Sequence, residues 1–290
     1  MKTPYEYLQK VSFVSPGMLL LLLLTGYPLI SVVQMSFYSY KKYNEPVFAG
    51  LFNYVETIRD PLFWNAMLNT ILFSVASVTI IIVSGLFFAS LLSQHINTKL
   101  RGALRTSLML PWLFSSSVVA SLWVIMLNPF GIVNWLLMKL GIVSEVIGWL
   151  GDERFALMAL VITNVWRSFP FAMLMLLAGL QTVSEDIKEA AVVDGAGPIK
   201  TFFYVILPQV KNVVFTVTTL QLIWDFRSFD LVFIMTGGGP MNKTEVPSTL
   251  VYTQAFRSMD FGRSAAVAIF MLLILIVMSF AYLRSTLGKE

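Results

Sequence analysis

The stretch EAAVVDGAGPIKTFFYVILP, residues 189–208, joins a short charged helix to a glycine-containing break and then to a long apolar segment. Ser184 is a suitable N-cap, and the two residues after it are acidic, which the helix dipole favours in a first turn. Gly195, followed by a second glycine and a proline, predicts the end of the helix. Three turns of helix are not stable alone in water. The stretch therefore predicts either a structural elbow between two longer helices or a helix that docks into a groove of a partner.

The rest of the chain is built for a membrane. Only 12% of its residues are charged and its mean hydropathy is +0.76, whereas soluble domains are about 25% charged. A helix needs roughly 20 apolar residues to cross a bilayer, and six segments meet this length, so the sequence predicts an all-α membrane protein. Residues 1–290 are expected to form one domain, with 184–208 as a connecting loop. The expected spans are at about 12–36, 66–92, 106–128, 156–180, 208–235 and 262–284.

Charge suggests how these spans are oriented. Six crossings place both termini on one side, and the loop 94–105 on that side contains Lys99, Arg101 and Arg105 but no acidic residue. Basic loops favour the cytoplasm, so both termini are predicted to be cytoplasmic. The net charge of +4 is explained by segments that flank membrane lipid, and it does not indicate a nucleic-acid partner. With no cysteine, disulfides and thiolate chemistry are excluded, and the single histidine, His95, is expected to be a solvated loop residue.

Motifs spread along the chain carry a family resemblance. The opening stretch fits the EAA motif, E-A-A-x-x-D-G-A-x(5)-F-x(4)-L-P, and resembles the membrane subunits of ATP-binding-cassette (ABC) importers. Other segments resemble the carbohydrate-uptake branch, which includes the first membrane subunit of maltose importers. They are SPG at 15–17, GLFNY at 50–54, DPLFWNAMLNT at 60–70, LPW at 110–112, NPFGIVNWLL at 128–137, TGGGP at 236–240 and AFRSMDFGRSAA at 255–266.

The resemblance implies a fold, a location and a set of partners. It implies six transmembrane helices in the type I importer (MetI-like) fold, in the cytoplasmic (inner) membrane of a bacterium or archaeon. The partners would be a second homologous permease subunit, two cytoplasmic ABC ATPases and an extracellular or periplasmic solute-binding protein, and the cargo a sugar or related solute. TGGGP would be a flexible turn at the outer mouth. The motif residues that would couple to the ATPase are Glu189, Ala190, Ala191, Asp194, Gly195 and Ala196.

The chain itself has no apparent site for nucleotide chemistry. A phosphate-binding loop requires a glycine-rich turn that ends in Gly-Lys-Ser/Thr. TGGGP lacks the lysine, and Gly288-Lys289 lies at the last residues with no such loop before it. The chain is therefore expected not to be an enzyme and to bind no cofactor, while ATP and Mg²⁺ would be used by the partner ATPases.

Polar residues inside the spans predict a route for the substrate. A strongly polar group at mid-helix costs about 2.5–3.5 kcal/mol to insert, so it usually faces a cavity or another helix. We expect one polar stripe on each of the third, fourth and fifth spans, where helical spacing places the residues of a stripe on one face. For the third span this requires that the helix continue through LPWLFSSS, residues 110–117. Arg227 and Asp230 are expected to project elsewhere. The substrate-path candidates are Trp112, Ser116, Asn164, Ser168, Gln221, Asp225 and Ser228.

The polar residues of the spans also fit roles that involve no substrate route. Asn164 and Ser168 are typical of polar contacts between neighbouring membrane helices, and Asp225 could form a structural ion pair with Arg167 or with a residue of a partner subunit. A second functional class is an ion-coupled secondary transporter in which Asp225 or Asp230 carries a proton or binds sodium. That class leaves the EAA pattern unexplained. A third class is a purely structural membrane subunit, which would not require polar stripes in three neighbouring spans.

Overall fold

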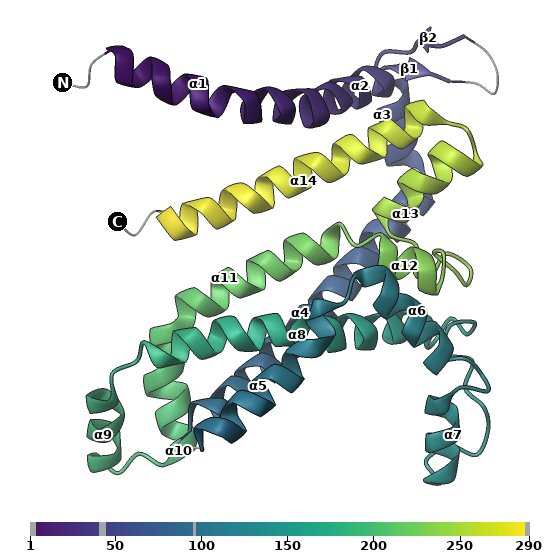
Figure 1. The fold of residues 1–290 in the computed structure, drawn as a ribbon. Helices are drawn as coiled ribbons and strands as arrows, with labels where there is room; N and C mark the ends of the chain where they lie inside the picture. Colours follow the sequence, from purple (N-terminus) through teal and green to yellow (C-terminus); the bar gives the residue numbers. More distant parts are fainter. Residues whose placement is uncertain (1–3, 41–44, 95–96, 288–290) are drawn as a thin grey trace. The chain divides into compact units, whose positions relative to one another are not determined.

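The computed structural model describes residues 4–40, 45–94 and 97–287, and it describes side chains from residue 12 to residue 284. His95 lies outside the described residues. The described chain is mostly helical (Figure 1), which agrees with the predicted all-α class. The helices are α1 (Pro4–Leu21), α2 (Tyr27–Ser36), α3 (Phe52–Arg59), α4 (Pro61–Ser93), α5 (Thr98–Leu113), α6 (Ser116–Met126), α7 (Ile132–Lys139), α8 (Ala156–Gln181), α9 (Glu185–Val193), α10 (Pro198–Lys200), α11 (Leu207–Phe226), α12 (Asp230–Met235), α13 (Pro247–Tyr252) and α14 (Phe261–Leu287).

Short irregular pieces complete the described chain. Two strands, β1 (Tyr38–Ser39) and β2 (Val47–Phe48), pair antiparallel with Tyr38 opposite Phe48. Three π-helical turns continue directly into or out of longer helices. These turns are Leu22–Gly26, Thr201–Ile206 and Thr253–Arg257.

The chain divides into two compact units. One contains Met1–Phe63 and Leu250–Leu273, and the other contains Trp64–Thr249 and Ile274–Glu290. The boundaries fall within α4, α13 and α14 rather than in a linker. The expectation of one domain over residues 1–290 remains a prediction.

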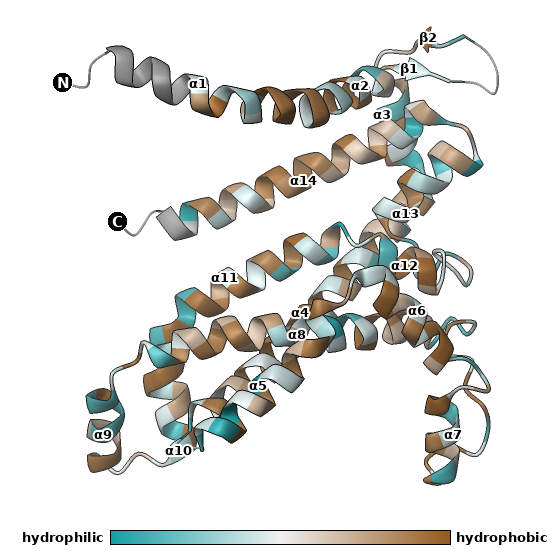
Figure 2. Cartoon of the chain, in the orientation of Figure 1, coloured by the Kyte–Doolittle hydropathy of each residue, from teal (hydrophilic) through white to brown (hydrophobic). Residues whose placement is uncertain are grey.

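Among the described residues, five helical segments are long and apolar enough to cross a membrane, and a sixth span results if α5 and α6 are counted together. The five segments are Ser12–Ser36, Pro61–Ser93, Ala156–Gln181, Pro198–Phe226 and Phe261–Arg284. Figure 2 shows apolar residues along most of α4, α11 and α14. This distribution matches the predicted number of crossings.

Two predicted spans are not continuous helices. The third breaks at Phe114, whose backbone is extended, and α6 restarts with Ser115 as its N-cap, so that α5 and α6 meet at 94°. The fifth span ends at Phe226, and α12 begins only at Asp230. The condition that the third helix continue through residues 110–117 is therefore not met, and the segment 208–235 is interrupted between Phe226 and Asp230. Irregular backbone at membrane depth is tolerated where it is buried in protein or lines a water-filled cavity.

The second unit is organised around α8. Its apolar side chains contribute to two buried clusters, one shared with α6 and α12 and the other with α4 and α11. Gly85 of α4 lies against α8, where an added Cβ would be 3.1 Å from Leu176 Cδ1, and Gly179 of α8 lies as close to Val213 of α11. Small residues at such contacts let membrane helices approach closely. The helix before the EAA loop and the helix after it are therefore packed directly on each other.

The first unit is held by polar contacts around α3. Asn53 Nδ2 donates to the backbone carbonyls of Ser36 and Tyr38, each at 2.9 Å. Arg263 of α14 forms an ion pair with Asp60 at 2.6 Å. Within this unit, the first predicted span buries none of its most apolar window inside the chain.

Candidate functional site

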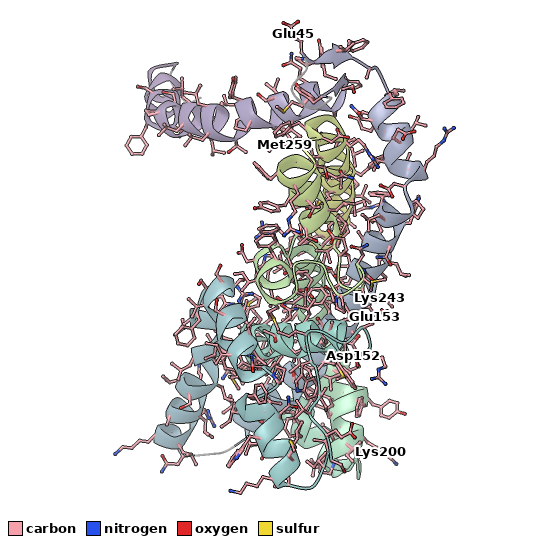
Figure 3. All side chains as sticks on the ribbon, turned by 90° about the vertical axis from the view of Figure 1, so that its right-hand side faces the viewer. Glu45, Asp152, Glu153, Lys200, Lys243 and Met259 are labelled. Carbon is pink, nitrogen blue, oxygen red and sulfur yellow. The ribbon has the colours of Figure 1, made fainter. Side chains whose placement is uncertain are left out.

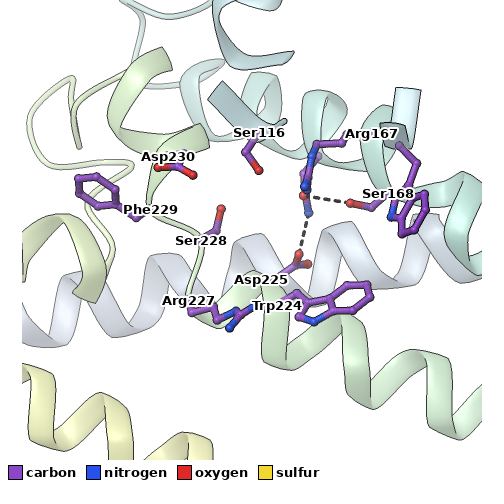
Figure 4. Close-up of a pocket in the computed structure, with 11 residues that line it drawn as sticks. Ser116, Arg167, Ser168, Trp224, Asp225, Arg227, Ser228, Phe229 and Asp230 are labelled. Carbon is purple, nitrogen blue, oxygen red and sulfur yellow. Dashed lines mark hydrogen bonds between the residues drawn. The ribbon is translucent and has the colours of Figure 1, made fainter. Parts of the chain in front are cut away.

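A polar cavity of about 600 Å³ opens in the second unit, where the two broken spans meet α8. Figure 4 shows its lining side chains converging from α6, α8, the end of α11 and the segment that leads into α12. The broken backbone therefore borders the cavity. The lining residues are Trp112, Ser116, Asn164, Arg167, Ser168, Trp224, Asp225, Arg227, Ser228, Phe229 and Asp230.

The centre of the cavity is a hydrogen bond between α8 and α11. Asn164 Nδ2 donates to Asp225 Oδ1 at 3.0 Å, and both side chains are buried. Asp225 Oδ2 has no hydrogen-bond partner in the described part of the chain. The Ser168 hydroxyl adds to this pair by donating a long hydrogen bond, 3.5 Å, to Asn164 Oδ1. A buried carboxylate oxygen without a donor is costly, and a polar solute in the cavity could supply that donor.

Arg167 faces the same cavity without an ion pair. Within the described residues it forms no salt bridge, and its Nε has no acceptor. The alternative of a structural ion pair between Asp225 and Arg167 is therefore not realised. Asn164 does bond a neighbouring helix, as the other alternative proposed, but it lines the cavity as well.

Arg227 and Asp230 also line the cavity, which corrects the expectation that they project elsewhere. That expectation assumed a continuous helix, in which they would turn away from Asp225. Because α11 ends at Phe226, the next residues follow the irregular connection instead. Two cationic and two anionic side chains thus border the cavity.

Aromatic rings form one wall. Trp112 stacks on Phe171 with 5.6 Å between ring centroids, and the tilted ring of Trp224 also packs on Phe171 at 4.9 Å. Trp112 remains 37% exposed, so part of its surface is available. An exposed aromatic face beside charged groups suits a solute with both apolar and hydroxyl-bearing surfaces.

The structure gathers six of the seven substrate-path candidates in this cavity, all except Gln221. Gln221 is fully buried, and neither of its side-chain polar atoms has a partner among the described residues. Trp112 and Ser116 do not share one helix face as expected, since the break lies between them, but the bend brings both to the cavity. The lining residues absent from the candidate set are Arg167, Trp224, Arg227, Phe229 and Asp230. The dense polar run WDFRSFD was the signal that could have indicated most of them.

The EAA loop has the local geometry that its residues predict. Ser184 caps α9 by accepting a hydrogen bond from the Asp186 backbone N–H at 3.2 Å. At the other end Gly195 adopts φ +77°. Its N–H donates to the Val192 carbonyl at 3.0 Å, and the N–H of Ala196 donates to the Ala191 carbonyl at 2.9 Å. This pair of bonds is a Schellman motif.

The surface of α9 is largely uncovered. Of its EAA residues, Glu189 and Ala190 are exposed and Ala191 is 8% exposed. Val192 and Val193 are 66% and 86% exposed, and Figure 2 shows an apolar last turn after the polar first turns. Beyond the helix, Asp194 and Gly195 are exposed and Ala196 is half-buried. Exposed valines on a helix this short indicate a surface available to a partner.

TGGGP forms a turn that is tied to α4. Asn65 and Asn69 donate to the Asn242 carbonyl at 2.7 and 3.0 Å. Gly238 has φ +90°, and a Cβ there would overlap the Glu245 carboxylate. The predicted turn is present, but these bonds hold it where a flexible segment was expected. Figure 3 places the neighbouring pair Lys243 and Glu153, 3.9 Å apart, well away from Lys200 of the EAA loop.

Residues 81–285 match the model of the protein family described as binding-protein-dependent transport system inner membrane component. Among curated proteins, the chain is 35% identical over 241 residues to the trehalose/maltose transport system permease protein MalF of Thermococcus litoralis, covering 83% of this chain and 80% of that one. It is 34% identical over 273 residues to the lactose transport system permease protein LacF of Rhizobium radiobacter, covering 92% and 90%.

Solved structures agree in fold. A chain from a bacterial ABC transporter involved in the import of the acidic polysaccharide alginate superimposes with a TM-score of 0.80 at 21% identity, covering 99% of both chains. A structure of the MetNI methionine ABC transporter matches 80% of this chain with a TM-score of 0.56 at 16% identity. The MetI-like fold is thereby confirmed, and an ion-coupled secondary transporter is not favoured.

Proposed function

Because the chain belongs to the family of binding-protein-dependent transport system inner membrane components, whose members are membrane subunits of ABC importers, we propose that it forms half of a pathway for an uncharged sugar. The central cavity is the observation that carries this proposal. Its two cationic and two anionic side chains balance, so the site favours a neutral polyhydroxy solute over an anion. The relatives that transport trehalose, maltose and lactose support a saccharide.

In this proposal the cavity binds the sugar through three kinds of group. Asp225 Oδ2 accepts from a hydroxyl, the guanidinium of Arg167 donates to ring or hydroxyl oxygens, and the face of Trp112 packs on the apolar side of a ring. A hydrogen bond to a charged group contributes about 1.5–3 kcal/mol. Gln221, buried one turn before Asp225, would support α11 rather than contact the sugar.

The proposed assembly contains a second homologous permease subunit, two cytoplasmic ABC ATPases and a solute-binding protein on the outer side. A structure of the alginate transporter in complex with a pentasaccharide-bound periplasmic protein supports the last of these partners. The uncovered valines of α9 support a cytoplasmic partner, and the apolar first span, unburied within its own chain, is available to a second membrane subunit or to lipid. This chain would be non-catalytic, both termini would be cytoplasmic, and ATP and Mg²⁺ would bind only the ATPases.

The path of the chain suggests how the ATPases reach the cavity. The EAA loop leaves α8 at Gln181 and enters α11 through the π-helical turn at Thr201–Ile206. These are the two helices joined by the Asn164–Asp225 bond. A displacement of Glu189 and its neighbours would move both ends of that bond. The loop can take up two positions, one in each state of the transporter. It drives alternating access only if the ATPase, in its different nucleotide states, binds these two positions of the loop with different affinity.

The test is ATP-driven uptake of a radiolabelled disaccharide by proteoliposomes that contain the whole complex and its binding protein. Asp225→Asn keeps the shape of the side chain and removes its charge, and we expect it to weaken the apparent affinity by about tenfold to a hundredfold. The matched control is Thr219→Ala, on the same helix but outside the cavity lining. Unchanged affinity in Asp225→Asn would refute the sugar site. Failure of the wild-type complex to couple uptake to ATP would refute the importer.

A further inference from the structure

A second cavity of the second unit is an apolar groove of about 550 Å³ beside the EAA loop. It lies between the last turns of α4, the end of α8 and the segment that follows α9. Its volume is within the range of about 300–1,000 Å³ typical of ligand sites. The lining residues are Val83, Leu86, Phe87, Ser90, Ser93, Gln94, Leu180, Pro198, Ile199, Phe202, Phe203, Ile206 and Leu207.

Both serine hydroxyls of the groove wall already donate within their own helix. The Ser90 hydroxyl donates to the Leu86 carbonyl at 2.7 Å, and the Ser93 hydroxyl donates to the Ser90 carbonyl at 2.8 Å. Phe87 and Phe203 are each 57% exposed, and Ile199 is 75% exposed. The groove therefore favours an apolar occupant over a polar one.

The depth of the groove matches one leaflet of a bilayer. From Val83 to Gln94 the helix rises by about 17 Å at 1.5 Å per residue, and half of a hydrocarbon core is about 15 Å. Gln94 is the first residue of the basic loop 94–105, so the deep end lies in the membrane and the other end at its surface. This geometry fits an acyl chain that runs parallel to the helix.

Positive charge lies at the surface end. Arg101 Nη2 donates to the Gln94 carbonyl at 2.6 Å, which fixes the guanidinium beside the groove. Its Nε–H is buried without a partner among the described residues, but three of its four terminal N–H donors remain for other acceptors, and no ion pair involves Arg101 in the described part of the chain. Lys99 lies two residues before Arg101 on the same helix, Lys200 follows the lining residue Ile199, and residues 97–113 contain no acidic side chain.

A helix of another membrane subunit is the competing occupant. Interfaces between membrane helices are enriched in small residues that allow close backbone approach. This groove contains neither glycine nor alanine, its two small residues are serines bonded to their own helix, and it presents three phenylalanines. Bulky, irregular apolar walls with a basic rim suit a flexible chain with an anionic head better than they suit a helix.

We propose that the groove binds one acyl chain of an anionic phospholipid of the cytoplasmic leaflet, with the headgroup phosphate held by Arg101. The proposal rests on the proposed function only in placing the EAA loop at the cytoplasmic surface. Because apolar contacts differ little between the groove and bulk lipid, the basic end gives the preference for anionic lipid. One basic residue near the membrane surface contributes about fivefold in affinity.

The test is photocrosslinking in the purified complex, reconstituted in phosphatidylcholine vesicles with a minor fraction of phosphatidylglycerol that carries a diazirine on its acyl chain. We expect labelled peptides from residues 83–94 and 198–207. Arg101→Gln should reduce this labelling about fivefold, and Ser90→Phe, which fills the groove, should abolish it. The matched controls, Arg105→Gln on the same helix and Ser84→Phe on α4, lie outside the lining and should label as wild type.

Phosphatidylcholine bearing the same diazirine measures the preference for the headgroup. Equal labelling by the two lipids, or wild-type labelling of the Arg101→Gln variant, would overturn the role of Arg101. Crosslinks from the groove to another protein subunit, with no lipid adduct in the assembled complex, would overturn the lipid assignment. Labelling is measured without sugar or ATP, so it does not depend on whether uptake is observed.

Discussion

The variant Gly195→Ala isolates one physical quantity, the backbone conformation that ends α9. Gly195 has φ +77°, and an added Cβ would meet nothing within 4 Å. The substitution therefore introduces no clash and removes no side-chain contact. It adds only the cost of a non-glycine residue in the left-handed region, about 1–2 kcal/mol.

This cost acts on the two hydrogen bonds of the Schellman motif, from Gly195 to Val192 and from Ala196 to Ala191. A penalty of one or two kcal/mol reduces the population of the capped loop relative to uncapped forms by a factor of about 5–30. If the capped loop is the form that engages the ATPase, ATP-driven uptake should fall by up to the same factor. The amount of subunit in the membrane should not change, because α8 and α11 are untouched.

Two companion variants make this prediction specific. Gly197→Ala lies in the same loop with equally open surroundings but with φ −69°, so we expect it to retain wild-type uptake. Gly195→Asn should recover much of the activity, since asparagine tolerates the left-handed region. The assay is uptake per inserted complex in proteoliposomes, with ATP hydrolysis measured in parallel. Equal uptake by Gly195→Ala and Gly197→Ala would refute the argument.

Two further predictions concern the loops distant from the EAA segment. Gly238→Ala places a Cβ on the Glu245 carboxylate at φ +90° and should cost about 1–3 kcal/mol, lowering the yield of monodisperse subunit in size-exclusion chromatography. Gly239→Ala, with its closest contact at 3.4 Å, is the control, and equal yields would contradict the packing argument. Hydrogen bonds from Arg154 lower the pKa of Asp152 to about 2. Their contribution to the stability of the folded state is therefore complete above about pH 4 and is lost as the pH falls through about 2. Arg154→Gln should move that pKa part of the way towards 3.8, because the backbone N–H of residue 154 still donates to Asp152. The ¹³C shift of the labelled carboxyl group reports the pKa, and a value still near 2 would exclude the Arg154 side chain as the main cause.

The sequence predicts the EAA loop well because its structure depends on neighbouring residues. Ser184 caps the helix, and Gly195 ends it by adopting a conformation that other residues avoid. Long apolar runs likewise locate the spans, since hydropathy integrates over about 20 residues. These local signals do not show which partner binds each exposed surface. The roles of Glu189 and its neighbours therefore remain predictions.

The helix breaks were not predictable in the same way. Phe114 leaves helical geometry with no glycine or proline at the break itself, and hydropathy remains high on both sides. The break depends on tertiary contacts, because α6 packs against α12 and not in line with α5. The directions of Arg227 and Asp230 depend on where α11 ends. Because the sequence did not show that end, their directions were also predicted wrongly.

These breaks also explain why so many polar groups can lie together at this depth. A continuous helix presents polar side chains on one stripe, whereas an interrupted helix also frees backbone groups and turns successive residues towards a common point. Here two interruptions face α8, and α8 and α11 carry the buried Asn164–Asp225 bond. The EAA loop connects those same two helices, so the segment that ATPases would move and the groups that a sugar would contact share rigid elements. Coupling between two such sites requires only that each ligand favour one arrangement of these helices over another, and the coupling free energy is then the same in both directions.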